Sequence, residues 1–364
     1  MSKPSSNAAE WYSLLDPVAP PTDMIRRPDD PRMWEVIEFW HGDPAALRPR
    51  RPVIIGFPQD EGVRRNFGRA GAAEAPRAIR SALWRLVSVD WGPGSDRDLK
   101  LPIDFGHNPP LDIGDIRISG SLEESQEVLG QVVARVLEAG AVPVVLGGGH
   151  ETAYGHYLGY VYAKRKVGIV NLDAHLDVRP LIDGRGHSGS PFRQAMEHPE
   201  RPLPGSHYVC LGIQPQSVSL AHVRYAHERG CFVCTAGGIQ TTVMRERELV
   251  RQIERLKKEG CFVYLTIDAD VVHERDVPGV SAPNPMGLPG YEINGAARMS
   301  GGYPGVSSLD LVEVNPRFDR DGQSSRWAAL VVWNFLMGLA LHSAAKGPAE
   351  TAPPARRAGK RRSR

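Results

Sequence analysis

The chain has 364 residues, of which 41% are apolar and 24% charged, so it has ample material for a globular core. Its formal net charge of +2 gives no overall field that would draw it to nucleic acid or to a membrane, and we expect neither as a partner. Four scattered cysteines argue against a disulfide scaffold, and the first residues show no secretory signal. We therefore expect a cytoplasmic protein.

Composition divides the chain into three parts. Residues 1–50 are rich in Pro, Asp and Arg and predict an irregular amino-terminal arm that packs on the main body. Residues 51–345 form the main domain. Residues 346–364 hold seven Lys and Arg side chains against Glu350 and predict a disordered, solvated basic tail. The rest of the chain is slightly acidic, which suits an enzyme that holds cations with carboxylates.

Short apolar runs alternate with stretches of helical periodicity through the main domain. Strands are predicted at 52–57, 110–116, 142–146, 167–172, 208–212, 232–235, 262–267 and 308–314. The clearest helices are predicted at 73–86, 122–138, 243–258 and 325–342. This alternation predicts an α/β fold, a three-layer α/β/α sandwich around a mostly parallel sheet. Ligands in such sheets bind beyond the carboxyl ends of the strands, so polar residues that directly follow a strand are the candidates for a site.

A glycine-rich turn follows the predicted strand at 142–146. Gly147, Gly148 and Gly149 permit unusual backbone angles and close approach by other segments, and His150 follows at once. A phosphate-binding turn is the alternative, but no Gly-Lys-Ser/Thr sequence follows. Alone, His150 is more often a plain hydrogen-bonded histidine than a ligand.

A second cluster follows the strand at 167–172. Asp173, His175 and Asp177 alternate with small or apolar residues, and at the end of an extended strand this spacing points all three the same way. A divalent cation would relieve the strain of crowding these ionisable groups. The mixed oxygen and nitrogen donors suit Mn²⁺, Zn²⁺, Fe²⁺, Co²⁺ or Ni²⁺ better than Ca²⁺. The alternative is a polar turn after a strand.

A third cluster, Asp268 and Asp270, follows the strand at 262–267. A lone Asp-x-Asp usually caps or turns the chain. The three segments together, however, offer two histidines and four aspartates, about the number that a two-metal site needs when carboxylates bridge the ions. Two cations make hydroxide available near neutral pH, so the sequence predicts metal-assisted hydrolysis.

The joint pattern resembles the ureohydrolase family, which includes arginase, agmatinase and formimidoylglutamase. The motifs that carry the resemblance are Gly148-Gly149-His150, Asp173-Ala174-His175-Leu176-Asp177, Asp268-Ala269-Asp270 and the stretch 308–316 around Glu313. The likeness covers roughly residues 50–340. It is greatest to the formimidoylglutamase branch, through residues 60–72, 149–151, 188–192 and 280–283.

This resemblance implies an arginase-like fold, a homo-oligomer and two divalent metal ions per chain, Mn²⁺ first, with Ni²⁺, Co²⁺ and Zn²⁺ as alternatives. One ion would be held by His150, Asp173, Asp177 and Asp268. The other would be held by Asp173, His175, Asp268 and Asp270, with Asp173 and Asp268 bridging the two.

The resemblance also implies roles in catalysis. Asp177 would pass a proton to the leaving amine, and Glu313 would pair with the cationic amidine. The implied substrate is N-formimino-L-glutamate, which is cleaved to L-glutamate and formamide in histidine degradation. Its carboxylates need cationic partners, and Arg65, Arg69 and Arg179 are candidates. His187 lies in the loop that shapes substrate access. For each of these four an ordinary structural or surface role is the alternative.

Two other functions stay open. Another ureohydrolase, acting on agmatine, guanidinobutyrate or arginine, would release urea. A catalytically silent, metal-binding scaffold belongs to a different class. The complete set of ligands argues against the scaffold, because clustered carboxylates are costly to keep without a use.

Overall fold

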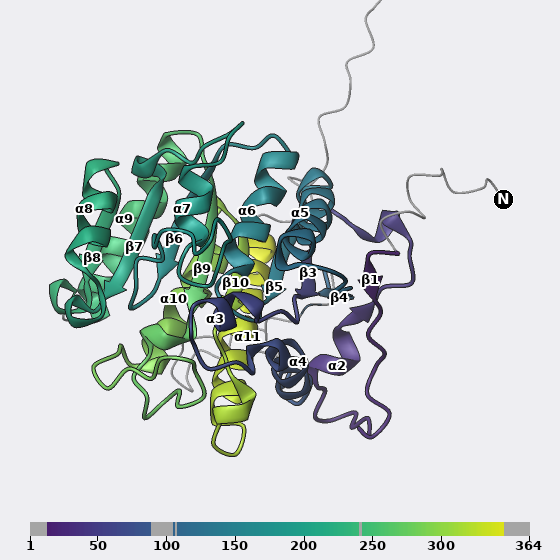
Figure 1. Ribbon diagram of the computed structural model, residues 1–364. Helices are drawn as coiled ribbons and strands as arrows, with labels where there is room; N and C mark the ends of the chain where they lie inside the picture. Colours follow the sequence, from purple (N-terminus) through teal and green to yellow (C-terminus); the bar gives the residue numbers. More distant parts are fainter. Residues whose placement is uncertain (1–12, 89–104, 106–107, 240–241, 346–364) are drawn as a thin grey trace, which may run out of the picture.

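The structure, a computed structural model, describes residues 13–88, 105, 108–239 and 242–345, and within these ranges ten strands form one sheet (Figure 1). The strands are β1 (Leu15–Asp16), β2 (Glu38–Phe39), β3 (Pro52–Gly56), β4 (Leu111–Ile116), β5 (Val142–Leu146), β6 (Val167–Leu172), β7 (Tyr208–Ile213), β8 (Phe232–Thr235), β9 (Phe262–Asp268) and β10 (Val306–Val312). Their order in the sheet is β1-β4-β3-β5-β10-β9-β6-β7-β8, and β2 pairs with β4. Neighbours are parallel except for β1 and β4, which confirms the predicted mostly parallel sheet.

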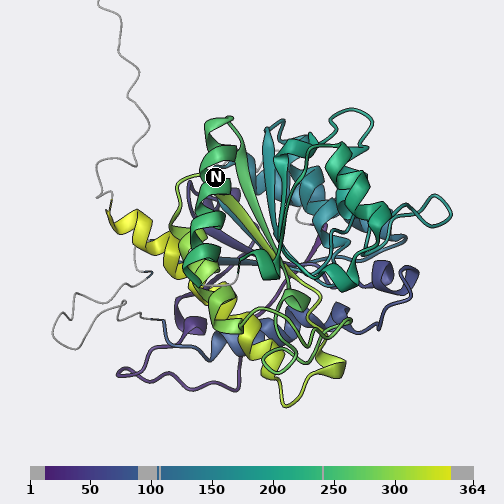
Figure 2. The same ribbon diagram turned by 90° about the vertical axis from the view of Figure 1, so that its left-hand side faces the viewer.

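Helices cover both faces of this sheet (Figures 1 and 2). They are α2 (Met33–Val36), α3 (Glu61–Arg65), α4 (Ala75–Trp84), α5 (Leu122–Glu138), α6 (Thr152–Tyr162), α7 (Pro191–Met196), α8 (Leu220–Glu228), α9 (Thr242–Lys258), α10 (Gly290–Gly302) and α11 (Gln323–Ala345). One hydrophobic core lies beneath α4, α9, α10 and α11, and a second lies beneath α5, α6, α7 and α8. Two helical layers around one sheet are the three-layer sandwich that the alternation predicts.

The central strands are apolar on both faces because both faces are covered. In β5, Val144 belongs to one core and Val145 to the other, as the alternation of side chains along a strand requires. The helix α5 shows the other periodicity. It begins at a capping box, in which Ser121 and Glu124 each accept a hydrogen bond from the other's backbone N–H, and it buries one face.

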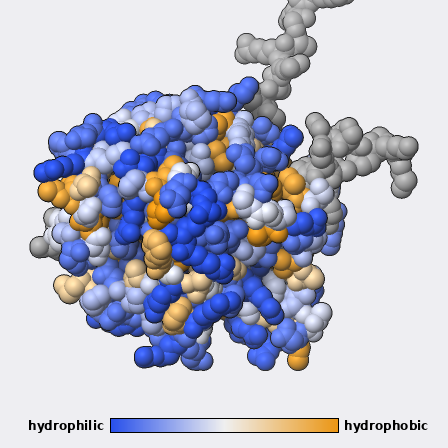
Figure 3. Space-filling model, in the orientation of Figure 1, coloured by the Kyte–Doolittle hydropathy of each residue, from blue (hydrophilic) through white to orange (hydrophobic). Residues whose placement is uncertain are grey.

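The long helix α11 is apolar around most of its circumference. By length and composition the stretch Gln323–Leu341 could cross a membrane, but 67% of it is buried inside the protein, where it packs on α10 and α4. A helix that is apolar on all sides is expected in such a core position. Polar and charged residues cover most of the molecular face shown in Figure 3.

The amino-terminal arm is more regular than its composition suggests. From residue 13 onward it contains β1, β2 and α2, and both short strands pair with β4. Two-residue strands are too short to leave a period in the sequence. Residues 1–12 of the arm and the predicted tail at 346–364 lie outside the described residues. The division of the chain at residue 50 stays a prediction.

A buried ion pair joins the helix α4 to the strand β4. Arg80 Nε donates to Asp112 Oδ2 over 2.8 Å, and the two side chains are 2% and 0% exposed. The same guanidinium also contacts Asp115 and the carbonyl of Gly114. This network fixes α4 against the edge half of the sheet.

Replacing Arg80 should therefore destabilise the protein severely. The substitution Arg80→Met leaves the carboxylate of Asp112 buried without its partner, and we expect the free energy of unfolding to fall by about 3–5 kcal/mol. Chemical denaturation measures this change. The control is Arg117→Met, which breaks a half-exposed pair with Asp16 and should cost at most about 1 kcal/mol. Equal losses in the two variants would contradict this account of Arg80.

Candidate metal centre

The candidate residues follow four strands that are adjacent in the sheet. His150 follows β5, Glu313 follows β10, Asp268 and Asp270 stand at the end of β9, and Asp173, His175 and Asp177 follow β6. The four strands lie in the order β5-β10-β9-β6 and are parallel, so their carboxyl ends meet at one edge. Segments that are far apart in the sequence therefore place their side chains at one point.

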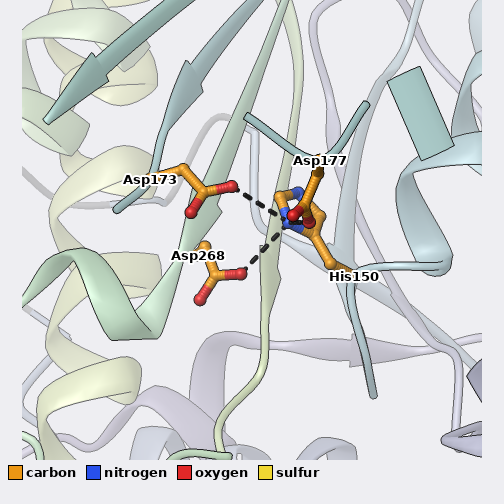
Figure 4. Close-up of side chains that lie close together, drawn as sticks. All are labelled: His150, Asp173, Asp177 and Asp268. Atoms are coloured by element: carbon orange, nitrogen blue, oxygen red, sulfur yellow. Dashed lines mark ion pairs between the residues drawn. The ribbon is translucent and has the colours of Figure 1, made fainter. Parts of the chain in front are cut away.

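Three carboxylates surround one nitrogen of His150 (Figure 4). His150 Nδ1 lies 2.9 Å from Asp177 Oδ2, 3.1 Å from Asp268 Oδ2 and 3.4 Å from Asp173 Oδ2. The side chains of His150, Asp173 and Asp268 are at most 3% exposed, and that of Asp177 is 10% exposed.

A second group of donors shares Asp173 with the first. His175 Nδ1 lies 3.1 Å from Asp270 Oδ2 and 3.5 Å from Asp173 Oδ1. Asp173 thus directs Oδ2 to one group and Oδ1 to the other, which is the arrangement of a bridging carboxylate. Asp268 joins only the first group in this geometry, and its Oδ1 accepts the backbone N–H of Asp270. The bridging role that the resemblance implies for Asp268 stays a prediction.

The donor set fits a divalent metal ion. Ligand atoms about 2.1 Å from a common cation and at right angles to one another lie about 3 Å apart, and the contacts of His150 Nδ1 are near this spacing. Among the described residues, Asp270 Oδ1 is a buried atom without a hydrogen-bond partner, so its lone pair is free to bind a cation. Oxygen and imidazole donors together suit transition ions such as Mn²⁺.

Protons take part in the balance of charge when no metal is bound. Burial opposes the charged form of His150, but hydrogen bonds to Asp173, Asp177 and Asp268 outweigh it and raise the pKa of His150 well above its usual value. The charge of Asp270 raises the pKa of His175 in the same way. Burial and neighbouring carboxylates raise the pKa of Asp177 and of Asp268. Asp173 has a lowered pKa, because its hydrogen bonds to the two imidazoles outweigh its burial.

The backbone at the site is unusual. Asp177 and Glu313 have φ angles of 46° and 63°, a left-handed conformation that residues other than glycine rarely adopt. Gly148 allows the loop before α3 to approach closely, because a Cβ at this position would lie 1.8 Å from Gln59 O. This agrees with the close approach that the three glycines predict.

Glu313 is held against the backbone of the histidine turn. Its Oε1 accepts the N–H of His150 over 2.8 Å, and its own N–H donates to Gly148 O. Burial, and then the nearby carboxyl of Glu151, raise the pKa of Glu313 well above its usual value. A bound cation would favour the ionised form of this carboxyl.

Sequence reasoning missed several polar residues that support the site. Asn171 Nδ2 donates to Asp173 Oδ2 over 2.9 Å, and Thr266 Oγ1 lies 3.1 Å from His150 Nε2. Glu151 accepts the N–H of Gly62, and burial raises its pKa to about 8. The available signal was a polar residue two positions before a candidate aspartate in an otherwise apolar strand, which describes Asn171 and Thr266.

Two of the three candidate arginines are occupied within the protein. Arg65 forms ion pairs with Glu123 and Glu61, and its Nη1 also donates to Gly186 O. Arg69 donates to the carbonyls of residues 280 and 281, and its guanidinium lies 4.1 Å from the ring centre of Phe318. Neither guanidinium is free to receive a substrate carboxylate without losing these contacts.

Arg179 is the arginine that stays available. Among the described residues it forms no ion pair, and its side chain makes one hydrogen bond, from Nη1 to Asn66 Oδ1 over 3.3 Å. His187 is 1% exposed, so it does not face solvent. Its Nε2 lies 3.0 Å from Pro180 O, and its Nδ1 accepts the N–H of Gly189. This side chain shapes the loop from within and does not present a free nitrogen to a substrate.

The sequence matches the model of the arginase family over residues 50–338. The chain therefore belongs to the arginase family. This family is the one that the motifs indicate in the sequence.

Similar proteins within the family are formimidoylglutamases. The enzyme of that name from Geobacillus thermodenitrificans is 40% identical over 299 residues, which cover 80% of this chain and 84% of the relative. A crystal structure of Trypanosoma cruzi formiminoglutamase with Mn²⁺ is 33% identical, has a TM-score of 0.73 and matches 86% of this chain and 99% of that one. Formimidoylglutamase from Bacillus subtilis has a TM-score of 0.77 at 26% identity, with 92% of this chain and 99% of that one covered. These likenesses confirm the arginase-like fold.

Metal binding should stabilise the protein more at high pH than at low pH. Without metal, the pKa values of His150, His175, Asp177 and Asp268 lie above their ordinary values, so the folded protein holds protons that the unfolded chain has released. The stability that these groups contribute is present at low pH and is lost as the pH rises through their folded pKa values. Asp173 has a lowered pKa, and its contribution is constant near neutral pH.

We therefore expect the increase in Tm on adding Mn²⁺ to be larger at about pH 8 than at about pH 6, because the ions replace protons. Thermal unfolding with Mn²⁺, and with a chelator as the control, measures this difference. The same increase at both pH values would contradict the exchange of protons for metal.

Proposed function

We propose that this chain is a metal-dependent hydrolase that cleaves N-formimino-L-glutamate to L-glutamate and formamide. Two divalent ions, Mn²⁺ first, would be held by His150, Asp173, His175, Asp177, Asp268 and Asp270. Family membership and the likeness to formimidoylglutamases along most of the chain support the substrate class.

One observation carries this proposal. Four adjacent strands bring two imidazoles, four aspartates and Glu313 to one edge of the sheet, with donor spacings that fit bound cations. A buried concentration of carboxylates is costly unless cations compensate it.

The reaction breaks the bond between the amidine carbon and the glutamate nitrogen. Two ions bound here would supply a water activated for attack and would stabilise the charge that develops at the amidine carbon. Asp177 would accept a proton and pass it to the departing nitrogen, which leaves as the amine of L-glutamate. Glu313, fixed by the N–H of His150, would pair with the amidinium and orient its carbon.

The carboxylates of the substrate need a cation near the site. Arg179 follows Asp177 by two residues and has no competing ion pair among the described residues, so we assign it this role. Asn66, which contacts both Arg179 and Ser188, would hold the guanidinium in position.

The remaining features of the proposed enzyme are its domain division, its location and its assembly. Residues 51–345 would form the catalytic domain, with the arm packed beside it. We propose that the enzyme is cytoplasmic, and that it is a homo-oligomer, as the resemblance implies for its assembly.

The decisive experiment measures the products of the metal-loaded protein. We expect formamide and L-glutamate in equal amounts from N-formimino-L-glutamate, and no urea from agmatine, guanidinobutyrate or arginine.

The variant Arg179→Met tests the role given to Arg179. It should raise KM for N-formimino-L-glutamate by about tenfold or more, because a charged hydrogen bond of about 1.5–3 kcal/mol is lost.

The other outcomes identify the alternatives. Urea from a guanidino compound, without formamide, would make the chain another ureohydrolase. The absence of both products with Mn²⁺, Co²⁺, Ni²⁺ and Zn²⁺ would support a silent metal-binding scaffold.

Two substitutions separate metal binding from substrate binding. The variant Asp173→Ala loses the carboxylate that faces both groups of donors, so we expect it to retain neither ion. Glu313→Gln should keep both ions and lower kcat/KM by about 30-fold or more, the effect of removing a buried charge pair worth about 2 kcal/mol. Metal analysis and steady-state kinetics check both variants. Normal turnover by Glu313→Gln would exclude the role given to Glu313.

A further inference from the structure

A pocket of about 270 Å³ opens at the edge of the sheet opposite to the candidate metal centre. It lies where the end of α6, the amino end of β6 and the loop at residues 200–204 meet. Val167, which lines the pocket, is the first residue of β6 and stands six residues before Asp173. At a rise of about 3.3 Å per residue, roughly 20 Å separate the pocket from the candidate ligands. The pocket is therefore not part of the metal centre.

The inner wall of this pocket is mostly apolar and is fixed by the fold. Its side chains are at most 8% exposed, and they are those of Tyr157, Val161, Val167, Leu203 and His207. Two hydrogen bonds hold the loop that closes one side. The N–H of Leu203 donates to Ala195 O over 2.9 Å, and the hydroxyl of Tyr157 donates to the carbonyl of Arg201. The shape of the pocket thus does not depend on a ligand.

The rim of the pocket is positively charged. Arg165, Lys166 and Arg201 stand on it, with Glu200 as the one carboxylate beside them. Arg165 and Lys166 donate to backbone carbonyls, which do not neutralise their charge. Within the part of the chain that the structure describes, none of the three cations lies within ion-pair distance of a carboxylate. Three cations against one carboxylate leave two positive charges uncompensated.

The next carboxylate, that of Glu259, is engaged elsewhere. It lies 3.2 Å from His207 Nε2 and forms an ion pair with Arg255 over 2.9 Å. The carboxyl-terminal segment of the chain cannot supply the missing charge either. Residues 346–364 hold seven Lys and Arg side chains against Glu350, so the rim would repel them. An anion that neutralises the rim must come from outside the chain.

We propose that this pocket binds a small organic carboxylate with an aromatic or branched apolar body. The apolar body would displace water from the inner wall, and the carboxylate would pair with the guanidinium groups of the rim. A volume of about 270 Å³ is at the small end of ligand pockets, which favours a molecule with about one ring over a nucleotide. The proposal concerns a second site and does not depend on the reaction at the metal centre.

The test is the binding of benzoate to the metal-free protein, measured by ligand-detected NMR titration. Metal-free protein is used so that the carboxylate has no ion to bind. Benzyl alcohol has the same ring without the charge, and we expect it to bind about threefold more weakly or less well still. Inorganic phosphate has the charge without the apolar body, so at equal concentration it should displace little of the bound benzoate.

Charge-reversed variants locate the binding. Arg201 is exposed, so Arg201→Glu should fold normally and weaken benzoate binding by about tenfold or more. The matched control is Arg224→Glu, which makes the same change at another exposed arginine, on α8 and outside the pocket. Arg179→Met is a second control, because Arg179 is the available arginine at the metal centre. Both controls should bind benzoate as the wild type does.

Several results would overturn the proposal. They are an absence of benzoate binding, an unchanged affinity in Arg201→Glu, and an equal loss in either control variant. Equal affinities for benzoate and benzyl alcohol would remove the role of the rim. Full displacement of benzoate by equimolar phosphate would remove the role of the apolar wall. None of these measurements uses substrate, so they leave the proposed reaction to its own test.

Discussion

The carboxylates of Asp173, Asp177 and Asp268 surround one imidazole nitrogen in a place that is almost closed to water. Like charges at this separation repel strongly where the dielectric constant is low, so they need compensation by protons or by metal ions. In the metal-free protein the raised pKa values of His150 and His175 provide the protons. The rest of the fold holds these groups together against their repulsion.

Regular structure supplies that restraint. Each cluster follows a strand that is hydrogen-bonded on both sides and covered by helices on both faces, so the donors stand on rigid supports. The left-handed backbone of Asp177 and Glu313 costs about 1 kcal/mol or more at each residue. The contacts of the surrounding structure must offset this cost. Buried polar partners, such as Asn171 and Thr266, orient the ligands from behind.

The sequence predicts the positions of the strands along the chain well, but it does not predict their order in the sheet. The eight strands of the main domain lie within one or two residues of their predicted bounds, because apolar runs between glycine and polar turns are distinctive. Periodicity carries no information on strand order, so the adjacency of β5, β10, β9 and β6 followed only from the family likeness. The helix α6 was missed because its residues are apolar on nearly every side and include two glycines. The sequence also cannot tell a paired arginine from a free one, since Glu123, the partner of Arg65, lies 58 residues away.

The sheet order has a consequence for how the protein matures. The strands β9 and β10 lie between β5 and β6, although they follow both in the sequence. In the complete sheet β5 and β6 are therefore three strand spacings apart, about 14 Å, with no direct contact. A nascent chain that has emerged only to residue 250 lacks both strands, and with them Asp268, Asp270 and Glu313, so it cannot form the complete candidate centre. The last strand in the sequence, β10, thus completes the middle of the sheet and the edge at which the candidate ligands meet.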